Sequence, residues 1–192
     1  KLFHAASLWS LKVASRIVDM VFYSSVPENN QIVQKAKEEF RNGIVVKRDQ
    51  LESYINEADC ILIGPGLPRK EGQEEGDDDT KELTGKLFRK YPKKKWVIDG
   101  GSLQTIKPEI IPKNSILTPH QGEFEKLFGV KPTSDSILEM SKKHSIAILV
   151  KGQVDIACSP NKCTPIKGGN AGITKGGTGD VLAGLVAALY CK

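Results

Sequence analysis

Short apolar segments alternate with helical segments along most of the chain, and this alternation limits the possible folds more than any other feature. The segments that predict strands are residues 18–23, 44–46, 59–63, 96–98, 115–117 and 146–150. The segments that predict helices are residues 5–17, 28–40, 50–57, 78–91, 123–127 and 136–144, followed by a buried apolar helix over 181–190. This order favours a three-layer α/β fold, in which helices cover both faces of a mostly parallel central sheet. Residues 154–166 predict a hairpin, so we expect the sheet to end antiparallel.

The bulk composition fits a single domain over residues 1–192. With 39% apolar and 27% charged residues, the chain has the composition of a globular protein and not of a disordered or fibrous one. No apolar run has the length of a membrane span, and no signal-peptide pattern opens the sequence. The net charge of +5 is modest and comes largely from surface lysines, so it does not indicate a nucleic-acid partner. We therefore expect a cytoplasmic protein with small-molecule ligands and no membrane partner.

The four cysteines do not have the paired spacing of a zinc site. Cys60 and Cys191 lie in apolar contexts and are expected to be buried thiols. Cys158 and Cys163 flank a turn sequence and would face each other across a hairpin. A disulfide between them is one alternative, but we expect reduced thiols because nothing in the sequence indicates secretion.

Glycine, proline and polar residues follow the ends of several predicted strands. These segments are Gly64-Pro65-Gly66, Asp99-Gly100-Gly101, Thr118-Pro119-His120 and Lys151-Gly152. In open parallel sheets, ligands bind at the carboxyl ends of the strands. The accumulation of such residues at one edge therefore predicts an active site there.

A further glycine-rich segment, Gly176-Gly177-Thr178-Gly179-Asp180, precedes the last predicted helix. Because its side chains are small, backbone N–H groups can surround a phosphate at the positive end of that helix. Asp180 would then lie where phosphoryl transfer requires a base. The alternative is a simple turn whose aspartate complements the helix dipole.

Three more polar residues have both a functional and a structural interpretation. His120 follows a Thr-Pro pair and can donate a hydrogen bond to a ligand, which we favour over a structural role. Glu123 falls in the first turn of the next helix, as a ligand contact or as a partner of the dipole. Asp99 would position a water molecule or magnesium, or would cap the next turn.

The start of the predicted hairpin suits a nucleotide. The exposed backbone after Lys151 could accept an adenine ring or ribose, with Lys151 near phosphate, and the glycine-rich residues 168–172 follow. The sequence contains neither a P-loop nor a strand-linked GxGxxG motif, so the phosphate site is expected to be of another kind.

Taken in order, these segments resemble the ADP- or ATP-dependent NAD(P)H-hydrate dehydratases, a branch of the ribokinase-like superfamily. The resemblance runs from about residue 5 to the C-terminus. It is carried by GPGL (64–67), Asp99, LTPHQGEFEKLFG (117–129), VKG (150–152), GNAG (169–172) and GGTGDVLAG (176–184).

The resemblance implies an enzyme that uses ATP or ADP, with magnesium, to dehydrate the S epimers of NADHX and NADPHX to NADH and NADPH. The ring hydroxyl would be phosphorylated and then lost as phosphate, a better leaving group than hydroxide. By this likeness Asp180 is the base, and Gly177, Thr178 and Gly179 form the anion hole. The implied substrate contacts are Ala5, Gly66, His120 and Asp180. The implied nucleotide contacts are Lys151, Gly152, Gln153, Val154, Asp155, Asn170 and Gly179.

The sequence departs from the family pattern in several places. His4 replaces the glycine usual before Ala5, and Asp99-Gly100-Gly101 lacks a second carboxylate. Pro68 and Lys175 replace smaller residues. The chain also starts without methionine and stops soon after the last predicted helix, so we expect parts of the family's full domain to lie outside it. The branch often forms homo-oligomers, which is expected here too.

Two other functions remain open at this point. One is a kinase for a small alcohol such as a vitamin precursor, which would share the Gly-Asp base, although the segment around His120 favours the dehydratase. The other is a nucleotide-binding protein without catalysis, suggested by the altered residues after Asp99.

Overall fold

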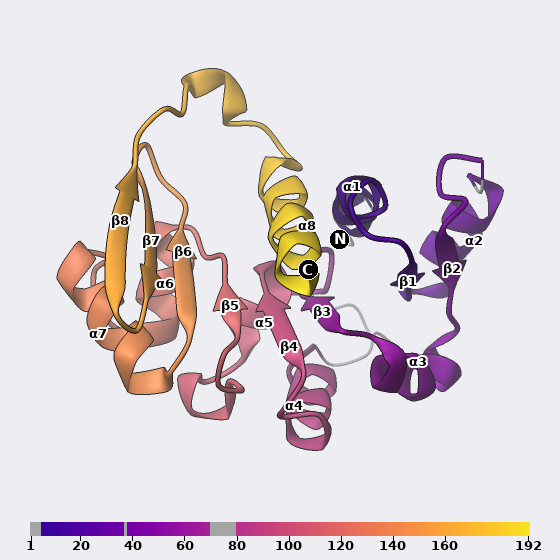
Figure 1. Cartoon of the computed structure of the whole chain (residues 1–192), viewed down its shortest axis with the longest axis horizontal. Helices are drawn as coiled ribbons and strands as arrows, with labels where there is room; N and C mark the ends of the chain where they lie inside the picture. The colour runs from indigo at the N-terminus through magenta and orange to yellow at the C-terminus, as the bar shows by residue number, and fades with distance from the viewer. Residues whose placement is uncertain (1–4, 37, 70–79) are drawn as a thin grey trace.

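The computed structural model describes residues 5–36, 38–69 and 80–192. Its main sheet has the strand order β3 (Cys60–Ile63), β4 (Lys95–Ile98), β5 (Ile116–Leu117), β6 (Ala147–Val150), β7 (Asp155–Ser159) and β8 (Lys162–Ile166). The strands from β3 to β6 pair in parallel, and β7 and β8 continue antiparallel. The expected mostly parallel sheet with a C-terminal hairpin is confirmed (Figure 1).

The first two strands form a separate sheet. β1 (Val21–Tyr23) pairs in parallel with β2 (Gly43–Val45), and among the described strands none is hydrogen-bonded between β1 and β3. Figure 1 shows β1 lying between β2 and β3. Residues of β1 and β3 line a cavity of about 760 Å³ that separates the two strand edges. The central sheet therefore does not include β1 and β2, because a gap replaces strand pairing between β1 and β3.

Helices cover both faces of the six-stranded sheet. One face carries α4 (Thr80–Lys90), α5 (Gly100–Thr105), α6 (Gln121–Phe128) and α7 (Ser134–His144). Side chains of these helices share one core with alternate strand residues, including Phe88, Trp96, Ile98, Phe124 and Ile137. Val97 is also fully buried, and strand alternation directs it to the opposite face. There α8 (Thr178–Cys191) contacts β3 and β4, and α1 (Ala5–Ala14) packs on α8.

The contact between α1 and α8 is unusually close. A Cβ atom on Gly184 would lie 2.6 Å from the carbonyl oxygen of Ser10, so only glycine permits this approach. The Ser10 hydroxyl donates a hydrogen bond of 2.8 Å to the carbonyl oxygen of Asp180. Helix α1 therefore fixes the first turn of α8, where the predicted base lies.

The expectation of a buried helix over residues 181–190 holds for one face only. Ala183, Gly184 and Ala188 are buried, whereas Val181 and Leu189 are 37% and 59% exposed. Small residues thus face the rest of the structure, and the larger apolar residues Val181 and Leu189 face outward.

Most predicted elements are found within a few residues of their expected bounds. The strand expected over residues 18–23 is shorter because hydrogen bonds continue the turn after α1 as far as Val18. Helix α2 (Pro27–Lys35) ends earlier than expected, and α3 (Leu51–Glu57) agrees closely. The sequence does not predict α5, since two glycines open it. The first residues of the helix expected over 78–91 lie outside the described residues.

The cysteine prediction needs a correction. Cys158 and Cys163 form a disulfide instead of remaining reduced. They are direct partners in the register of β7 and β8, with Cα atoms 4.1 Å apart, which brings the sulfur atoms within bonding distance. Cys60 and Cys191 are free, and each is partly buried where a fully buried thiol is expected.

Within the described ranges, none of the helices is both long enough and apolar enough to cross a bilayer.

Candidate active site

The carboxyl ends of β3, β4, β5 and β6 meet at one edge of the sheet, as their parallel pairing requires. The segments that follow them begin at Gly64, Asp99, Thr118 and Lys151. A bridge between His120 and Lys151, with Lys151 N–H donating to the Pro119 carbonyl, extends the pairing beyond β5 and β6. The predicted accumulation of polar and glycine residues at this edge is confirmed.

A partly buried ion pair lies at the centre of this edge. The Nζ atom of Lys151 is 2.9 Å from Oδ1 of Asp99, and the Thr118 hydroxyl donates to the same oxygen over 2.9 Å. Burial raises the pKa of the Asp99 carboxyl, and the Lys151 ammonium and the Thr118 hydroxyl oppose that rise. The Asp99 carboxylate therefore pairs with Lys151 and Thr118. It does not cap α5, because it makes no hydrogen bond to the backbone of that helix.

The N-terminus of α8 faces the same ion pair. Gly177 is its N-cap, with φ of 97°, a left-handed conformation that favours glycine. A Cβ atom on Gly179 would lie 3.3 Å from Nζ of Lys151, so the ammonium group sits beside the first turn. The Thr178 hydroxyl donates to the Lys175 carbonyl over 3.0 Å, which closes the glycine loop on itself. Backbone donors at a helix start, with a lysine beside them, form a site suited to an anion.

Asp180 occupies the first turn of α8 and is only partly buried. Burial raises the pKa of its carboxyl to about 6, and the negative charge of Asp99 adds to the rise. Lys151, Arg69 and the residue's own backbone N–H oppose it. A carboxyl with this pKa is ionised at neutral pH and is more basic than an ordinary aspartate, as a general base should be.

His120 has a structural role in addition to any ligand contact. Its Nδ1 accepts a hydrogen bond of 3.2 Å from the backbone N–H of Glu123, whose carboxylate accepts one of 2.9 Å from the backbone N–H of His120. This capping box starts α6. Because Nδ1 accepts, the neutral imidazole carries its proton on Nε2. The side chain is 56% exposed, so that N–H is available to a ligand.

Glu123 has a structural role as part of the capping box of α6. Its carboxylate is buried and also accepts a hydrogen bond of 3.0 Å from the Gln104 amide. Helix capping thus accounts for the contacts of this residue, and no ligand contact is proposed for it.

The loops after β3 and β4 are locked together. A Cβ atom on Gly64, whose φ is 117°, would lie 1.7 Å from the carbonyl oxygen of Asp99. A Cβ atom on Gly101 would lie 2.3 Å from the carbonyl oxygen of Leu67, so this position has no room for a second carboxylate. Gly66 lines the cavity between β1 and β3, together with Ser7 and Tyr23. The lining of that cavity does not include Asp99, Lys151 or Asp180.

The predicted nucleotide contacts lie on exposed backbone beyond Lys151. Gly152 donates its N–H to Oδ1 of Asp155 over 2.9 Å, which closes the turn and leaves Gln153 and Val154 exposed. A Cβ atom on Gly169 would be 3.9 Å from the Gln153 carbonyl, so the loop before α8 comes close to this turn. The side-chain Oδ1 of Asn170 accepts a hydrogen bond of 2.8 Å from Gly172 N–H and caps η3 (Ala171–Ile173). Its side chain is therefore partly used within the loop.

The described residues do not form a protein cage for magnesium. Within the described part of the chain, no group of three or more His, Cys, Asp or Glu side chains is placed to hold a metal ion. Oδ1 of Asp99 is already used by Lys151 and Thr118. Magnesium commonly binds through one or two carboxylates together with substrate phosphates, and only such a nucleotide-borne ion fits these residues.

Ala5 begins α1 and is partly buried, and no contact with the ion pair is found for it. The sequence interpretation missed the roles of Thr118 and Ser10, which support Asp99 and the backbone of Asp180. The position of Thr118 at a strand end is a signal that could have identified it. Ser10 gives no such signal, because its partner lies 170 residues away in the sequence.

Comparison with known proteins identifies the family. A family model described as NAD(P)H-hydrate dehydratase matches residues 5–192. The bifunctional NAD(P)H-hydrate repair enzyme Nnr of Methanocaldococcus jannaschii is 32% identical over 198 residues, which cover 98% of this chain and 37% of that protein. The ADP-dependent (S)-NAD(P)H-hydrate dehydratase of Cenarchaeum symbiosum is 38% identical over 102 residues, covering 50% of this chain and 36% of the relative. The chain thus spans little more than a third of either relative.

Solved structures agree on the fold. A ribokinase-like superfamily protein from Enterococcus faecalis superposes with a TM-score of 0.82 at 22% identity, covering 97% of this chain and 66% of its own. An ADP/ATP-dependent NAD(P)H-hydrate dehydratase from Bacillus subtilis, co-crystallised with ATP/Mg2+ and soaked with CoA, has a TM-score of 0.75 at 22% identity. That match covers 98% of this chain and 70% of the other. With a ribokinase-like fold and a family model that matches from the start of α1 to the last residue, this chain belongs to the NAD(P)H-hydrate dehydratase family.

Proposed function

We propose that the protein to which this chain belongs dehydrates the S epimers of NADHX and NADPHX to NADH and NADPH, with ATP or ADP as phosphoryl donor. The observation that carries the proposal is the position of Asp180, a carboxyl with a raised pKa in the first turn of α8, beside the Lys151–Asp99 ion pair. The names of the curated relatives and of the Bacillus subtilis structure support the same reaction.

The first step is proton removal from the hydroxyl group on the hydrated nicotinamide ring. The Asp180 carboxylate accepts this proton, and the hydroxyl oxygen forms a bond to the terminal phosphorus of the nucleotide. The bond between that phosphorus and the nucleotide's bridging oxygen breaks, which leaves ADP from ATP or AMP from ADP. In the second step the ring C–O bond breaks with its electron pair on phosphate. The neighbouring ring carbon loses a proton to water, and the electrons of that C–H bond form the double bond of the reduced nicotinamide.

The glycine loop and Lys151 would stabilise the transferring group. Backbone N–H groups at the start of α8 would bind phosphoryl oxygens, and the Lys151 ammonium beside Gly179 adds positive charge. Gly177, Thr178 and Gly179 are thus proposed as the anion hole. Fixed donors of this kind stabilise charge that develops in the transition state, since they need no rearrangement.

The remaining ligand contacts are proposed from position. Nε2–H of His120, together with Gly66 and Ala5, would hold the hydrated nucleotide. The exposed turn from Lys151 to Asp155 and the neighbouring Asn170 loop would hold the phosphoryl donor. Magnesium bound to the donor's phosphates would neutralise part of their charge, and no residue of the chain is assigned to it. The cytoplasmic location and homo-oligomeric state remain predictions.

The test is recovery of reduced nicotinamide absorbance when the full-length protein is incubated with NADHX and either ATP or ADP. We expect recovery with at least one nucleotide and no recovery without any. Release of a stable phosphorylated alcohol from a different substrate would support a kinase instead. If neither nucleotide restores NADH while nucleotide binding is retained, the proposal is wrong.

A further inference from the structure

Trp9 lies against the glycine loop at the N-terminus of α8. A Cβ atom on Gly177 would be 2.8 Å from Nε1 of Trp9 and 2.9 Å from Cδ1, so the pyrrole side of the indole packs directly on this glycine. Two independent features therefore require glycine at position 177, namely its positive φ and the indole beside it. Helix α1 and the glycine loop therefore meet at Gly177, where the proposed anion hole begins.

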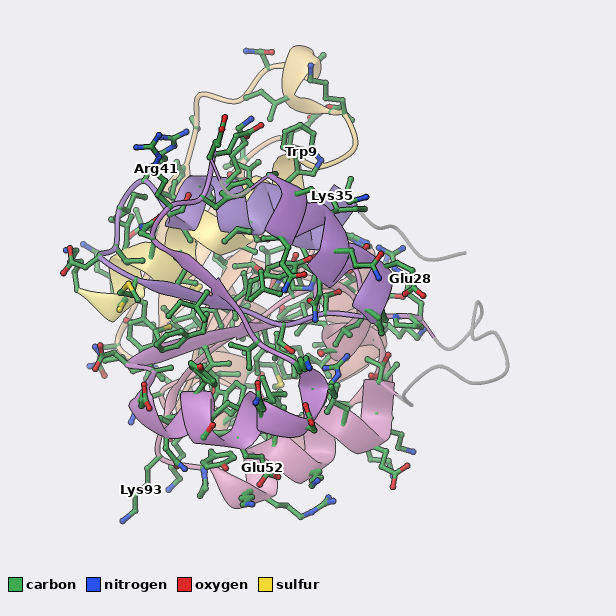
Figure 2. The ribbon with its side chains drawn as sticks, turned by 90° about the vertical axis from the view of Figure 1, so that its right-hand side faces the viewer. Trp9, Glu28, Lys35, Arg41, Glu52 and Lys93 are labelled. Atoms are coloured by element: carbon green, nitrogen blue, oxygen red, sulfur yellow. A yellow bond between two sulfur atoms is a disulfide. The ribbon has the colours of Figure 1, made fainter. Side chains whose placement is uncertain are left out.

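The indole is nevertheless open to solvent over much of its surface. Trp9 is 42% exposed, whereas Trp96, the other tryptophan of the chain, is fully buried. No hydrogen bond from the indole N–H to another described residue is found. Figure 2 shows Trp9 on the outer side of α1, where the ribbon approaches the loop that precedes α8. A large aromatic side chain usually gains stability from burial and from a partner for its polar edge, and here both are incomplete.

The position of α1 indicates which ligand would cover the indole. α8 stands between α1 on one side and the β6–β8 region on the other, which carries the turn proposed for the phosphoryl donor (Figure 1). Ser7 and Ser10 of α1 line the same cavity as Gly64 and Gly66. Trp9 is also one helical turn from Ala5, so the two residues share a face of α1. Two of the proposed substrate contacts, Ala5 and Gly66, thus lie on the α1 side of α8, whereas His120 is bridged to Lys151. Trp9 is not among the residues that line the cavity, and it adjoins the substrate contacts through Ala5 and the glycine loop.

We propose that Trp9 is a substrate-binding residue, whose indole forms one wall of the site for the hydrated nicotinamide ring. The inference rests on the proposed function and adds a residue to it. The apolar face would cover the partly reduced ring, and the indole N–H would donate a hydrogen bond to an oxygen of the ring substituents or of the phosphoryl group at the glycine loop. Trp9 would select the nicotinamide end of the substrate and would make no contact with the adenine of the donor.

Collisional quenching of tryptophan fluorescence tests this directly. Acrylamide should quench Trp9 and leave Trp96 almost unaffected, because Trp96 is fully buried. We expect saturating NADHX to reduce acrylamide quenching of the full-length protein by at least half, and ATP or ADP alone to leave it unchanged. In Trp9→Phe, both the quenching and its suppression by NADHX should be lost.

Kinetics provide a second measurement. Trp9→Ala should raise KM for NADHX about tenfold, and Trp9→Phe about threefold because it keeps an aromatic face but loses the N–H. KM for the nucleotide should not change. Leu189→Ala, which removes an exposed apolar side chain from the far end of α8, is the matched control and should leave both KM values unchanged.

The possible outcomes separate this inference from the proposed function. If NADHX is turned over but neither protects Trp9 from acrylamide nor responds kinetically to Trp9→Ala, the role of Trp9 is wrong and the function stands. If Trp9→Ala raises KM for ATP or ADP instead, Trp9 belongs to the donor site and the inference is again overturned. If calorimetry detects no NADHX binding and no turnover occurs, the proposed function and the inference fall together.

Discussion

The Nζ atom of Lys151 lies 2.9 Å from Oδ1 of Asp99, and this ion pair joins the ends of β4 and β6 beneath the first turn of α8. The side chains of Lys151 and Asp99 are only 21% and 5% exposed, so water screens their charges weakly. Burial is the main cause of the raised pKa of Asp180, the charge of Asp99 raises this pKa further, and the charge of Lys151 lowers it. The basicity of the proposed base is therefore set in part by a residue from a different strand.

Replacement of Asp180 tests its role as the base. We expect Asp180→Asn to reduce kcat by about 10³-fold, within the usual contribution of general-base catalysis, while nucleotide binding is retained. Asp135→Asn is a matched control because Asp135 also lies in the first turn of a helix, away from the sheet edge. Steady-state kinetics and nucleotide calorimetry on both variants provide the comparison. Near-normal turnover by Asp180→Asn would remove the residue from the mechanism.

The rate should depend on pH through the same group. Because burial raises the pKa of Asp180 to about 6, kcat should rise with pH through about 6 and level off above it. A plateau that extends unchanged down to about pH 4 would contradict this assignment. The pH dependence of kcat at saturating substrate is the measurement.

Stability should depend on pH in the opposite direction. The folded protein holds the Asp180 proton up to about pH 6, whereas the unfolded chain releases it near 3.8, the ordinary value. Stability contributed by this group is therefore complete below about pH 4 and is lost as pH rises through 6. At pH 8, Asp180→Asn should be more stable than the unchanged protein by about 1 kcal/mol, a value reduced for partial exposure. Urea unfolding at pH 4 and pH 8 measures the difference, which should vanish at the lower pH.

Asp99→Asn tests the coupling through the ion pair. The negative charge of Asp99 raises the pKa of Asp180, and Lys151 lowers it. Removal of the Asp99 charge should therefore lower the pKa of Asp180 and move the acid limb of the kcat profile to lower pH. Thr118→Val keeps the carboxylate and removes one hydrogen bond to it, so its acid limb should stay close to that of the unchanged protein. An acid limb that does not move in Asp99→Asn would show that the two carboxylates are not coupled.

Gly64 should tolerate no side chain. In Gly64→Ala the new Cβ would overlap the Asp99 carbonyl in a positive-φ conformation, and we expect a loss of about 3 kcal/mol or more in unfolding free energy. Gly129→Ala is the control, because its φ is also positive, at 72°, but no atom lies within 4 Å of the added Cβ. Its loss should be about 1 kcal/mol. Equal urea midpoints for the two variants would contradict the tight packing of the two loops.

Thiol labelling tests the disulfide. Under non-reducing conditions, denatured protein should expose two reactive thiols from four cysteines, and reduction should expose all four. In the folded state Cys60 should react slowly at pH 8, since burial raises its pKa to about 12. Mass spectrometry of the labelled peptides identifies the sites. Four thiols before reduction would mean that Cys158 and Cys163 are not joined.

Local patterns in the sequence predict the strand ends well. The residues Gly64, Asp99, Thr118 and Lys151 follow apolar strands, and parallel pairing alone brings them to one edge. Contacts between distant segments were not predicted from these patterns. The pairing of Asp99 with Lys151 spans 52 residues, and the hydrogen bond from Ser10 to Asp180 spans 170. Helix α5 was missed for a different reason, since its two opening glycines have low helix propensity. The close approach of Leu67 requires glycine at position 101, and a positive φ beside Gly64 favours it at position 100.

The open edges of β1 and β3 affect how this stretch of polypeptide will behave in solution. Each edge presents N–H and C=O groups that no described neighbouring strand satisfies, and both border a largely apolar hollow. An extended segment from another molecule could add to either edge, as occurs when sheets associate in aggregates. Preparations of these 192 residues alone should therefore self-associate more readily as concentration rises, and light scattering would detect it.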